Sequence, residues 1–164
     1  MTNRRLTILL LSALLCAGAH AETAPAAPTA ATAPTTAPTG EAIGIIQNLQ
    51  GTVTIARAGA TLPAMVGTPL YRGDLVRTGK PGAVGIVLGD DTTISAGSAS
   101  ELALNDYIFD PNNGKFALAV RMLKGTFSYI TGQIGKLAPD TVKVRTPDAT
   151  IATRGTKVLI EIKD

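Results

Sequence analysis

Short apolar runs of strand length, separated by turn residues, constrain the fold of this chain more than any other feature. They fill the segment from Ile43 to Asp164 and recur about every ten residues, a spacing typical of all-β domains. The clearest runs are Thr52–Ile55, Ala83–Leu88, Phe116–Met122, Thr126–Ile130, Thr141–Arg145 and Lys157–Ile162. Because no helical period is sustained beyond about ten residues, residues 43–164 are predicted to form one all-β domain with little helix.

Turn residues lie between these runs. The clusters of Gly, Pro, Asp and Asn are Gly73–Asp74, Lys80–Gly82, Gly89–Asp91, Asn112–Gly114, Gly125 and Pro147–Asp148. Short strands and turns at this spacing are typical of a β-sandwich, a barrel or a rolled β-solenoid. Composition does not choose among the three.

The N-terminus has the three parts of a secretory signal peptide. Arg4 and Arg5 precede an apolar run, Leu6–Ala17, and small residues follow it. The run is shorter than the about 20 residues that a helix needs to cross a bilayer. Residues 1–21 are therefore predicted to be a removable signal, and the protein to be periplasmic or secreted without a stable transmembrane anchor.

The cleavage site is predicted between Ala21 and Glu22, because Ala19 and Ala21 suit the small-residue pockets of signal peptidase. A lipoprotein anchored through Cys16 is disfavoured, since Leu15 stands where a small residue should precede the lipidated cysteine. Residues 22–42 consist mostly of Ala, Thr and Pro, and are predicted to be a disordered tether.

Removal of the signal also removes the single cysteine, Cys16, and the single histidine, His20. Thiolate nucleophiles, Ser/His/Asp triads and zinc sites built on Cys or His are then excluded. The adjacent carboxylates of Asp90 and Asp91 would face opposite sides of a strand, so they could not flank one bond. The chain is predicted to be no enzyme and to carry no cofactor.

The charge balance argues against a nucleic-acid partner. The chain has 15 Lys and Arg against 12 Asp and Glu, and loss of Arg4 and Arg5 brings the mature protein close to neutrality. Aromatic residues make up only 4% of the sequence, whereas single-stranded nucleic acids are bound by basic grooves with aromatic platforms.

A calcium site is one interpretation of the segment around Gly114. Oxygen-bearing side chains gather there, namely Asp106, Asp110, Asn112 and Asn113. Their spacing does not match an EF-hand loop, which needs a bidentate glutamate. A hairpin connection at Asn113–Gly114 explains the segment more simply, and no metal is predicted.

The order of several motifs resembles the FecR domain family. The matching segments are Gly51–Ile55, Leu70–Thr78, Ala83–Asp90, Leu102–Leu104, Leu123–Phe127, Val144–Pro147, Ala149–Ile151 and Arg154–Thr156. The resemblance implies a rolled, solenoid-like β fold, with a β-sandwich as the alternative. The namesake of the family looks like a membrane-spanning regulator of a sigma factor, whereas this chain resembles the stand-alone secreted members.

A contact surface is predicted where the family signature is densest. Its candidate residues are Arg145, Thr146, Pro147, Arg154, Gly155 and Thr156. Two arginines can hold a carboxylate or a phosphate bidentately, and a glycine lets a backbone approach closely. The alternative is that the arginines pair with Asp148 or Glu161 and only shape the fold.

The sequence thus predicts a non-catalytic protein-interaction module of the cell envelope, connected with signalling or sensing. Its partner would be an envelope protein or glycan, captured partly through an exposed strand edge. The alternative is a self-associating structural component, a homo-oligomer that uses the same edge on copies of itself.

Overall fold

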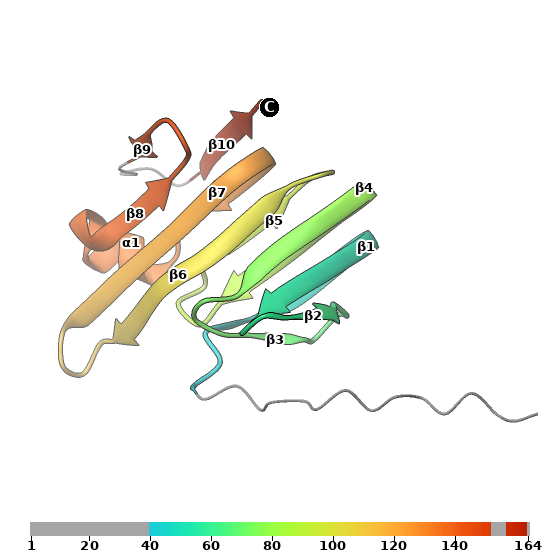
Figure 1. Ribbon diagram of the computed structural model, residues 1–164. Helices are drawn as coiled ribbons and strands as arrows, with labels where there is room; N and C mark the ends of the chain where they lie inside the picture. The colour runs from blue at the N-terminus through green and yellow to red at the C-terminus, as the bar shows by residue number, and fades with distance from the viewer. Residues whose placement is uncertain (1–39, 152–156, 164) are drawn as a thin grey trace, which may run out of the picture. The chain divides into compact units, whose positions relative to one another are not determined.

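The computed structural model describes residues 40–151 and 157–163 of the 164-residue chain. One ten-stranded sheet dominates these residues (Figure 1). Its strands are β1 Gly44–Arg57, β2 Ala60–Pro63, β3 Pro69–Leu70, β4 Leu75–Leu88, β5 Thr93–Ala96, β6 Glu101–Asp110, β7 Lys115–Ile130, β8 Val142–Arg145, β9 Thr150–Ile151 and β10 Lys157–Ile162. A short helix, α1 Gln133–Leu137, and a 3-10 turn, η1 Pro139–Thr141, separate β7 from β8.

Three long strands organise the sheet: β1 and β4 have 14 residues each and β7 has 16. β1 pairs with β4 along its length, and β5 and β6 follow one another between β4 and β7. These pairings of β4, β5, β7 and β6 make a closed circuit. The outer side of β1 carries β2 and β3, and the outer side of β7 carries β8 and β10.

The long strands bend back near their middles, so that their halves lie in two layers (Figure 1). Glycines occupy the bend. Gly51 has φ +68° and Gly125 has φ +99°, both in the left-handed region that other residues avoid. A Cβ atom would strike the Pro81 carbonyl oxygen at Gly51 and the Ser100 side chain at Gly125. The bend therefore depends on residues without side chains.

The predicted turns at Lys80–Gly82 and Gly125 are wrong, because β4 and β7 continue through them. The glycines there serve the bend of a strand and do not end it. The pairing of β1 with β4 shifts register between Gly51 and Val53, which is how a β-bulge lets a sheet change direction.

The two layers share a single hydrophobic core. Both halves of β1 contribute to it, through Ile46 and Ile55, and so do both halves of β7, through Leu118 and Tyr129. Burying a large apolar side chain stabilises a fold by roughly 1.5–3 kcal/mol, so this cluster holds the layers together. The all-β prediction is confirmed, whereas the choice between a rolled solenoid-like form and a sandwich stays a prediction.

A buried polar cluster fixes the crossover from β7 to β8. The Asp90 carboxylate is fully buried, and it accepts hydrogen bonds from the Thr92 hydroxyl at 2.7 Å and the Ile134 amide at 3.2 Å. The Thr92 hydroxyl oxygen accepts one from the Gly132 amide at 3.1 Å. The start of α1 is thus tied to the β4–β5 turn, and the chain returns to place β8 parallel to β7. In the described part of the chain, no helix has the length and apolar character to cross a membrane.

Candidate binding surface

The parallel pairing of β7 with β8 brings two arginines together. Val142 and Val144 of β8 point into the core, so Lys143 and Arg145 point outward. The register places Arg145 directly opposite Arg121 of β7, which is also exposed. Residues opposite one another on neighbouring strands project from the same face of a sheet. Two arginine side chains therefore leave the same face of the sheet from neighbouring strands.

A tight turn after β8 completes a cleft around these arginines. The Ala149 amide donates to the Thr146 hydroxyl oxygen at 3.0 Å, and the Thr146 amide donates to the Ala149 carbonyl at 2.8 Å. The resulting cleft has a volume of about 340 Å³. We call it the arginine cleft, and it is lined by Arg121, Arg145, Thr146, Pro147, Asp148, Ala149 and Thr150.

Of the six residues predicted for the contact surface, the structure brings Arg145, Thr146 and Pro147 into this cleft. Arg154, Gly155 and Thr156 lie outside the described residues. Arg121 was not predicted, because only the strand register reveals that it neighbours Arg145.

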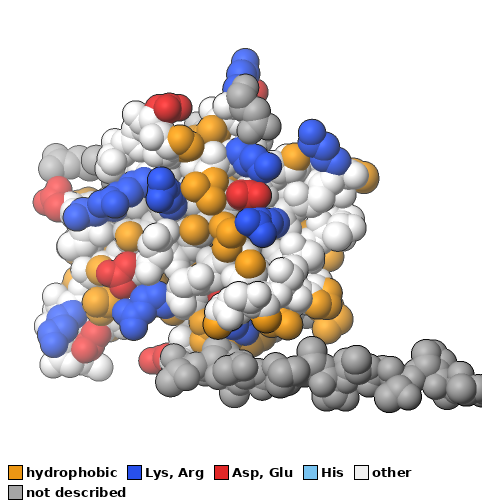
Figure 2. All heavy atoms as spheres, in the orientation of Figure 1, with side chains coloured by type: hydrophobic (Ala, Val, Ile, Leu, Met, Phe, Trp, Pro, Cys, Tyr) orange, Lys and Arg blue, Asp and Glu red, His pale blue; other side chains and the backbone are white. Residues whose placement is uncertain are grey.

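Arg121 and Arg145 differ from the other described arginines, because no ion pair joins them to an acidic side chain of the described residues. In residues 40–151 and 157–163, ion pairs join Arg57 to Asp74, Arg72 to Asp106, and both Arg77 and Lys124 to Glu101. No ion pair there links Arg145 to Asp148 or Glu161, the alternative weighed from the sequence. Figure 2 shows Lys and Arg side chains over the part of the sheet that carries β8, and others spread over the rest of the same face. This surface is suited to an anion.

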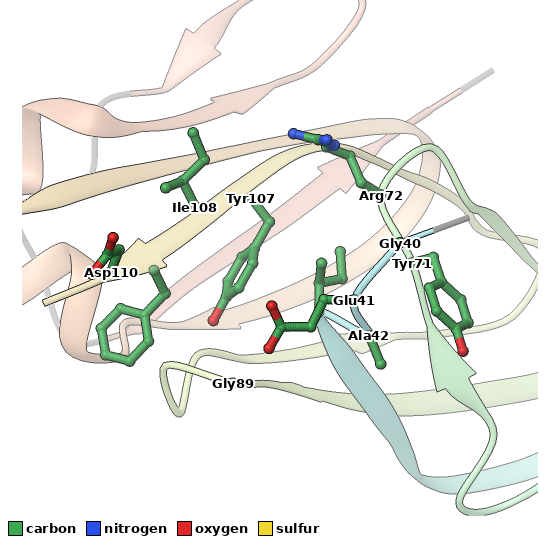
Figure 3. A pocket seen from close by; sticks show the side chains of 11 residues that line it. Gly40, Glu41, Ala42, Tyr71, Arg72, Gly89, Tyr107, Ile108 and Asp110 are labelled. Atoms are coloured by element: carbon green, nitrogen blue, oxygen red, sulfur yellow. The ribbon is translucent and has the colours of Figure 1, made fainter. Parts of the chain in front are cut away.

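A second cleft, of about 480 Å³, lies where the chain enters the sheet (Figure 3). We call it the aromatic cleft; it is lined by Gly40, Glu41, Ala42, Ile43, Tyr71, Arg72, Gly89, Tyr107, Ile108, Phe109 and Asp110. The chain has only six Tyr and Phe residues, three of each, and three of the six line this cleft. Tyr107 and Phe109 lie on β6, whereas Tyr71 follows β3, so only the fold reveals that the three share one cleft.

Two of those aromatics are held firmly by the fold. The Tyr107 hydroxyl lies 3.5 Å from the Asp90 carboxylate, and burial together with that carboxylate raises the pKa of Tyr107 above its ordinary value. The ring of Phe109 packs against Phe116 with centroids 6.1 Å apart. Glu41, Arg72 and Asp110 provide charge at the rim. Rigid rings beside a few polar groups are the usual make-up of a ligand cleft.

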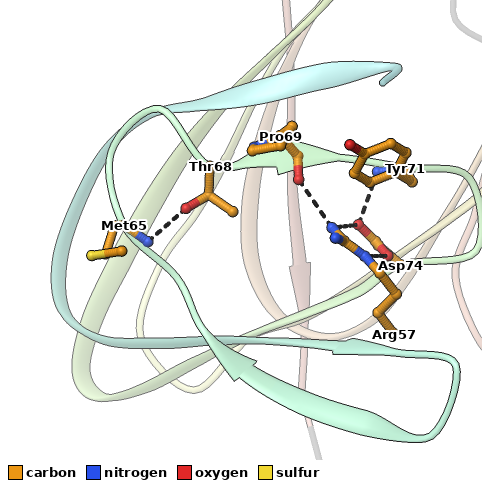
Figure 4. Close-up of polar contacts among 6 residues, drawn as sticks. All are labelled: Arg57, Met65, Thr68, Pro69, Tyr71 and Asp74. Carbon is orange, nitrogen blue, oxygen red and sulfur yellow. Dashed lines mark hydrogen bonds and ion pairs between the residues drawn. The ribbon is translucent and has the colours of Figure 1, made fainter. Parts of the chain in front are cut away.

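A third polar cluster is structural. The Arg57 guanidinium donates to both carboxylate oxygens of Asp74, at 2.8 and 2.7 Å, and to the Pro69 carbonyl at 2.9 Å (Figure 4). It also lies 4.4 Å from the ring centroid of Tyr71, whose amide donates to Asp74. The hydrogen bond and charge of Asp74 raise the pKa of Arg57 despite partial burial. Every charge here has a partner, so the cluster secures a loop and leaves nothing for a ligand.

The segment weighed for calcium forms the β6–β7 hairpin. The Asn113 amide and side chain both donate to the Asp110 carboxylate, at 3.2 and 2.7 Å, and Gly114 has φ +64°. These contacts are those of a turn. Within the described ranges, no three His, Cys, Asp or Glu residues come close enough to hold a metal ion.

Comparison with known proteins adds three findings. A family model described as "FecR protein" matches residues 74–164. A solved structure titled "Cell surface anchoring domain" is similar over 38% of this chain and 83% of its own length, with 36% sequence identity and a TM-score of 0.36. No curated protein is a significant match.

Proposed function

Because the chain belongs to the FecR protein family, we propose that it is a non-catalytic interaction module of the cell envelope. The module binds an acidic segment of an envelope protein in the arginine cleft, and that binding serves signalling or sensing. The mature protein carries no cofactor and works in the periplasm or outside the cell.

One observation carries this proposal: Arg121 and Arg145 stand in register on neighbouring strands and have no acidic partner among the described residues. Placing like charges side by side is unfavourable unless something neutralises them. Arginine forks bind carboxylates through two parallel hydrogen bonds, which are stronger than neutral ones. A carboxylate from a partner would remove the repulsion and gain these bonds.

The proposal is tested by capturing envelope proteins with the immobilised mature chain. We expect Arg121→Glu and Arg145→Glu each to reduce the amount of the same partner captured at least tenfold, because the negative charge of the new glutamate repels an acidic segment. Lys80→Glu is the matched control, since Lys80 is exposed and makes the same change of charge elsewhere. If all three variants lose capture equally, net charge and not the cleft is responsible.

The aromatic cleft favours a second candidate function, the binding of an envelope glycan. Its support is the concentration of Tyr71, Tyr107 and Phe109 around one cavity with charged residues at the rim. Titration with soluble cell-wall glycan fragments, followed by calorimetry, tests it. Phe109→Ala should abolish the heat of binding, whereas Tyr107→Phe, which keeps the ring, should retain it. Absence of binding by the unaltered protein would eliminate the glycan.

The division of the chain is part of the same proposal: a signal at residues 1–21, a tether at 22–42 and the FecR domain at 43–164. The rolled, solenoid-like form of the sheet is proposed with it, on the strength of the strands that bend back on themselves. N-terminal sequencing of the exported protein should find Glu22 first. If the exported protein instead begins at a lipid-bearing Cys16, the protein is anchored to a membrane and the proposal of a free module is wrong.

A further inference from the structure

The strand β10 offers an unused edge. It pairs antiparallel with β7 over six residues, from Lys157 opposite Ile130 to Ile162 opposite Gly125. Among the described strands it has no neighbour on its other side. The backbone amides and carbonyls of such an edge can pair with another strand. The turn that lines the arginine cleft lies near this strand, since Thr146 and Asp148 line a further hollow together with Glu161.

The two faces of β10 differ sharply. Ile160 is buried in the core, with Val158 and Ile162 packed against it. The opposite face presents Lys157, Leu159 and Glu161 to solvent. Leu159 is 72% exposed, the most exposed of the large apolar side chains that the structure describes. Its neighbour across the strand pair is Ser128, which is too small to cover it.

We propose that two copies of this protein join through β10, antiparallel and related by a two-fold axis that passes beside Leu159. In that register the two Leu159 side chains meet each other. Lys157 of each copy then stands opposite Glu161 of the other, twice over. Opposite charges and apolar residues placed directly across a strand pair stabilise the pairing. The outward face of β10 is therefore complementary to itself, as a two-fold interface requires.

The sequence of β10 selects this register over its neighbours. Any other register that keeps Val158, Ile160 and Ile162 facing the core must shift the two β10 strands by an even number of residues. Moved one way, Lys157 would face Leu159 of the second copy; moved the other way, Leu159 would face Glu161. Either shift separates the charges from their partners and exposes leucine again.

The small size of the contact sets its strength. Two six-residue strands bury well below the roughly 1,000 Å² typical of a stable interface. We therefore expect a reversible dimer that forms with rising concentration. Each dimer would carry two arginine clefts, so that a partner with two acidic segments could bind both.

Sedimentation equilibrium of the mature protein over a concentration series tests the charge pairing. Lys157→Glu and Glu161→Lys should each weaken dimerisation at least tenfold, because like charges then face each other across the axis. The double variant with both exchanges restores opposite charges and should recover dimerisation. A protein that stays monomeric at every concentration, or a double variant no better than the singles, would overturn the proposal.

Cysteine trapping tests the register independently of charge. Residues opposite one another on antiparallel strands have Cα atoms about 4.5–5.5 Å apart, within the range that a disulfide spans. Leu159→Cys should therefore form a disulfide-linked dimer under mild oxidation. Lys157→Cys alone should not, whereas a mixture of Lys157→Cys and Glu161→Cys proteins should. If Lys157→Cys links to itself as readily as Leu159→Cys, the proposed register is wrong.

Discussion

The two edges of the sheet are built in opposite ways. At the β1 edge, β2 and β3 cover the outer side of the long strand, and the bidentate Arg57–Asp74 pair secures the loop that follows. At the β7 edge, β8 brings two arginines together without a described acidic partner, and β10 leaves its outer side free. The β1 edge has its charges paired within the fold, whereas the β7 edge presents to solvent two arginines that are unpaired among the described residues.

The difference separates residues that serve the fold from those available to a partner. Asp74 has a side-chain exposure of 1% and Arg57 of 15%, so removing Asp74 would leave the guanidinium with the Pro69 carbonyl and the Tyr71 ring but without a counter-charge. Arg121 and Arg145 are exposed, and the fold does not use their charge.

The largest expected effect on stability comes from the β1 edge. Asp74→Ala should lower the free energy of unfolding by about 3 to 5 kcal/mol, because it strands a partly buried guanidinium. Urea denaturation measures this. Asp106→Ala is the matched control, since its pair with Arg72 has side-chain exposures of 47% and 62% and exposed pairs contribute only about 0–1 kcal/mol. Equal losses in the two variants would remove the distinction between the edges.

A second effect concerns the bend that places both edges. Gly125→Ala should destabilise the protein by roughly 2 to 4 kcal/mol, because it combines a left-handed φ with a clash against Ser100. Gly114→Ala has a similar φ of +64° but open space around it, so it should cost only about 1 kcal/mol. Thermal unfolding of both variants separates the clash from the backbone strain. Equal costs would mean that the bend tolerates a side chain.

A third effect depends on pH and lies beneath β10, where Tyr129 pairs with Val158. Burial raises the pKa of Tyr129 from 10 to about 12, so the folded state holds that proton more tightly than the unfolded one. The resulting stability is complete below pH 10 and is lost as pH rises toward 12, amounting to roughly 2–3 kcal/mol. Tyr129→Phe should flatten the stability curve between pH 10 and 12.

The same variant should cost little at pH 7, because the buried Tyr129 hydroxyl makes no well-formed hydrogen bond among the described residues and has only the Thr92 side chain near it. A loss of more than about 1 kcal/mol at pH 7 would show that this hydroxyl is bonded in solution. Tyr107→Phe is the comparison, since its hydroxyl lies near Asp90 and should matter more.

The smallest effect on stability is expected at the β7 edge. Arg121→Glu and Arg145→Glu should each change the free energy of unfolding by less than about 0.5 kcal/mol, as exposed residues without contacts usually do. Either substitution also removes the repulsion between the two neighbouring positive charges of Arg121 and Arg145. A loss as large as that of Asp74→Ala would make the arginines part of the fold and would weaken their assignment to a partner.

The strand-like runs of the sequence correspond to five of the ten strands, β1, β4, β7, β8 and β10, and they do not give the full extent of the long ones. Lys157–Ile162 matches β10 from end to end, and Ala83–Leu88 lies inside β4. Phe116–Met122 and Thr126–Ile130 were predicted as two strands, yet both belong to β7. Gly125 looked like a turn because glycine serves turns and sheet bends alike, and only the neighbouring Ser100 distinguishes them.

The candidate site was predicted in part. Arg145, Thr146 and Pro147 stood out through their motif, whereas Arg121 lies in the middle of an ordinary strand. Its role depends on the parallel register of β7 with β8, which is set by the buried Asp90 and Thr92 cluster that fixes the crossover. Registers between distant segments arise from such tertiary contacts and leave no local pattern.

Photo-crosslinking in intact envelopes tests the central claim most directly. A photo-reactive residue is placed at Thr150, beside the arginine cleft, or at Thr61 in β2, and both positions are exposed. We predict that Thr150 captures a distinct envelope protein, that Arg145→Glu abolishes the capture, and that Thr61 captures none. Capture of the same protein from Thr61, or capture from Thr150 that survives Arg145→Glu, would contradict the assignment of binding to the arginine cleft at the β7 edge.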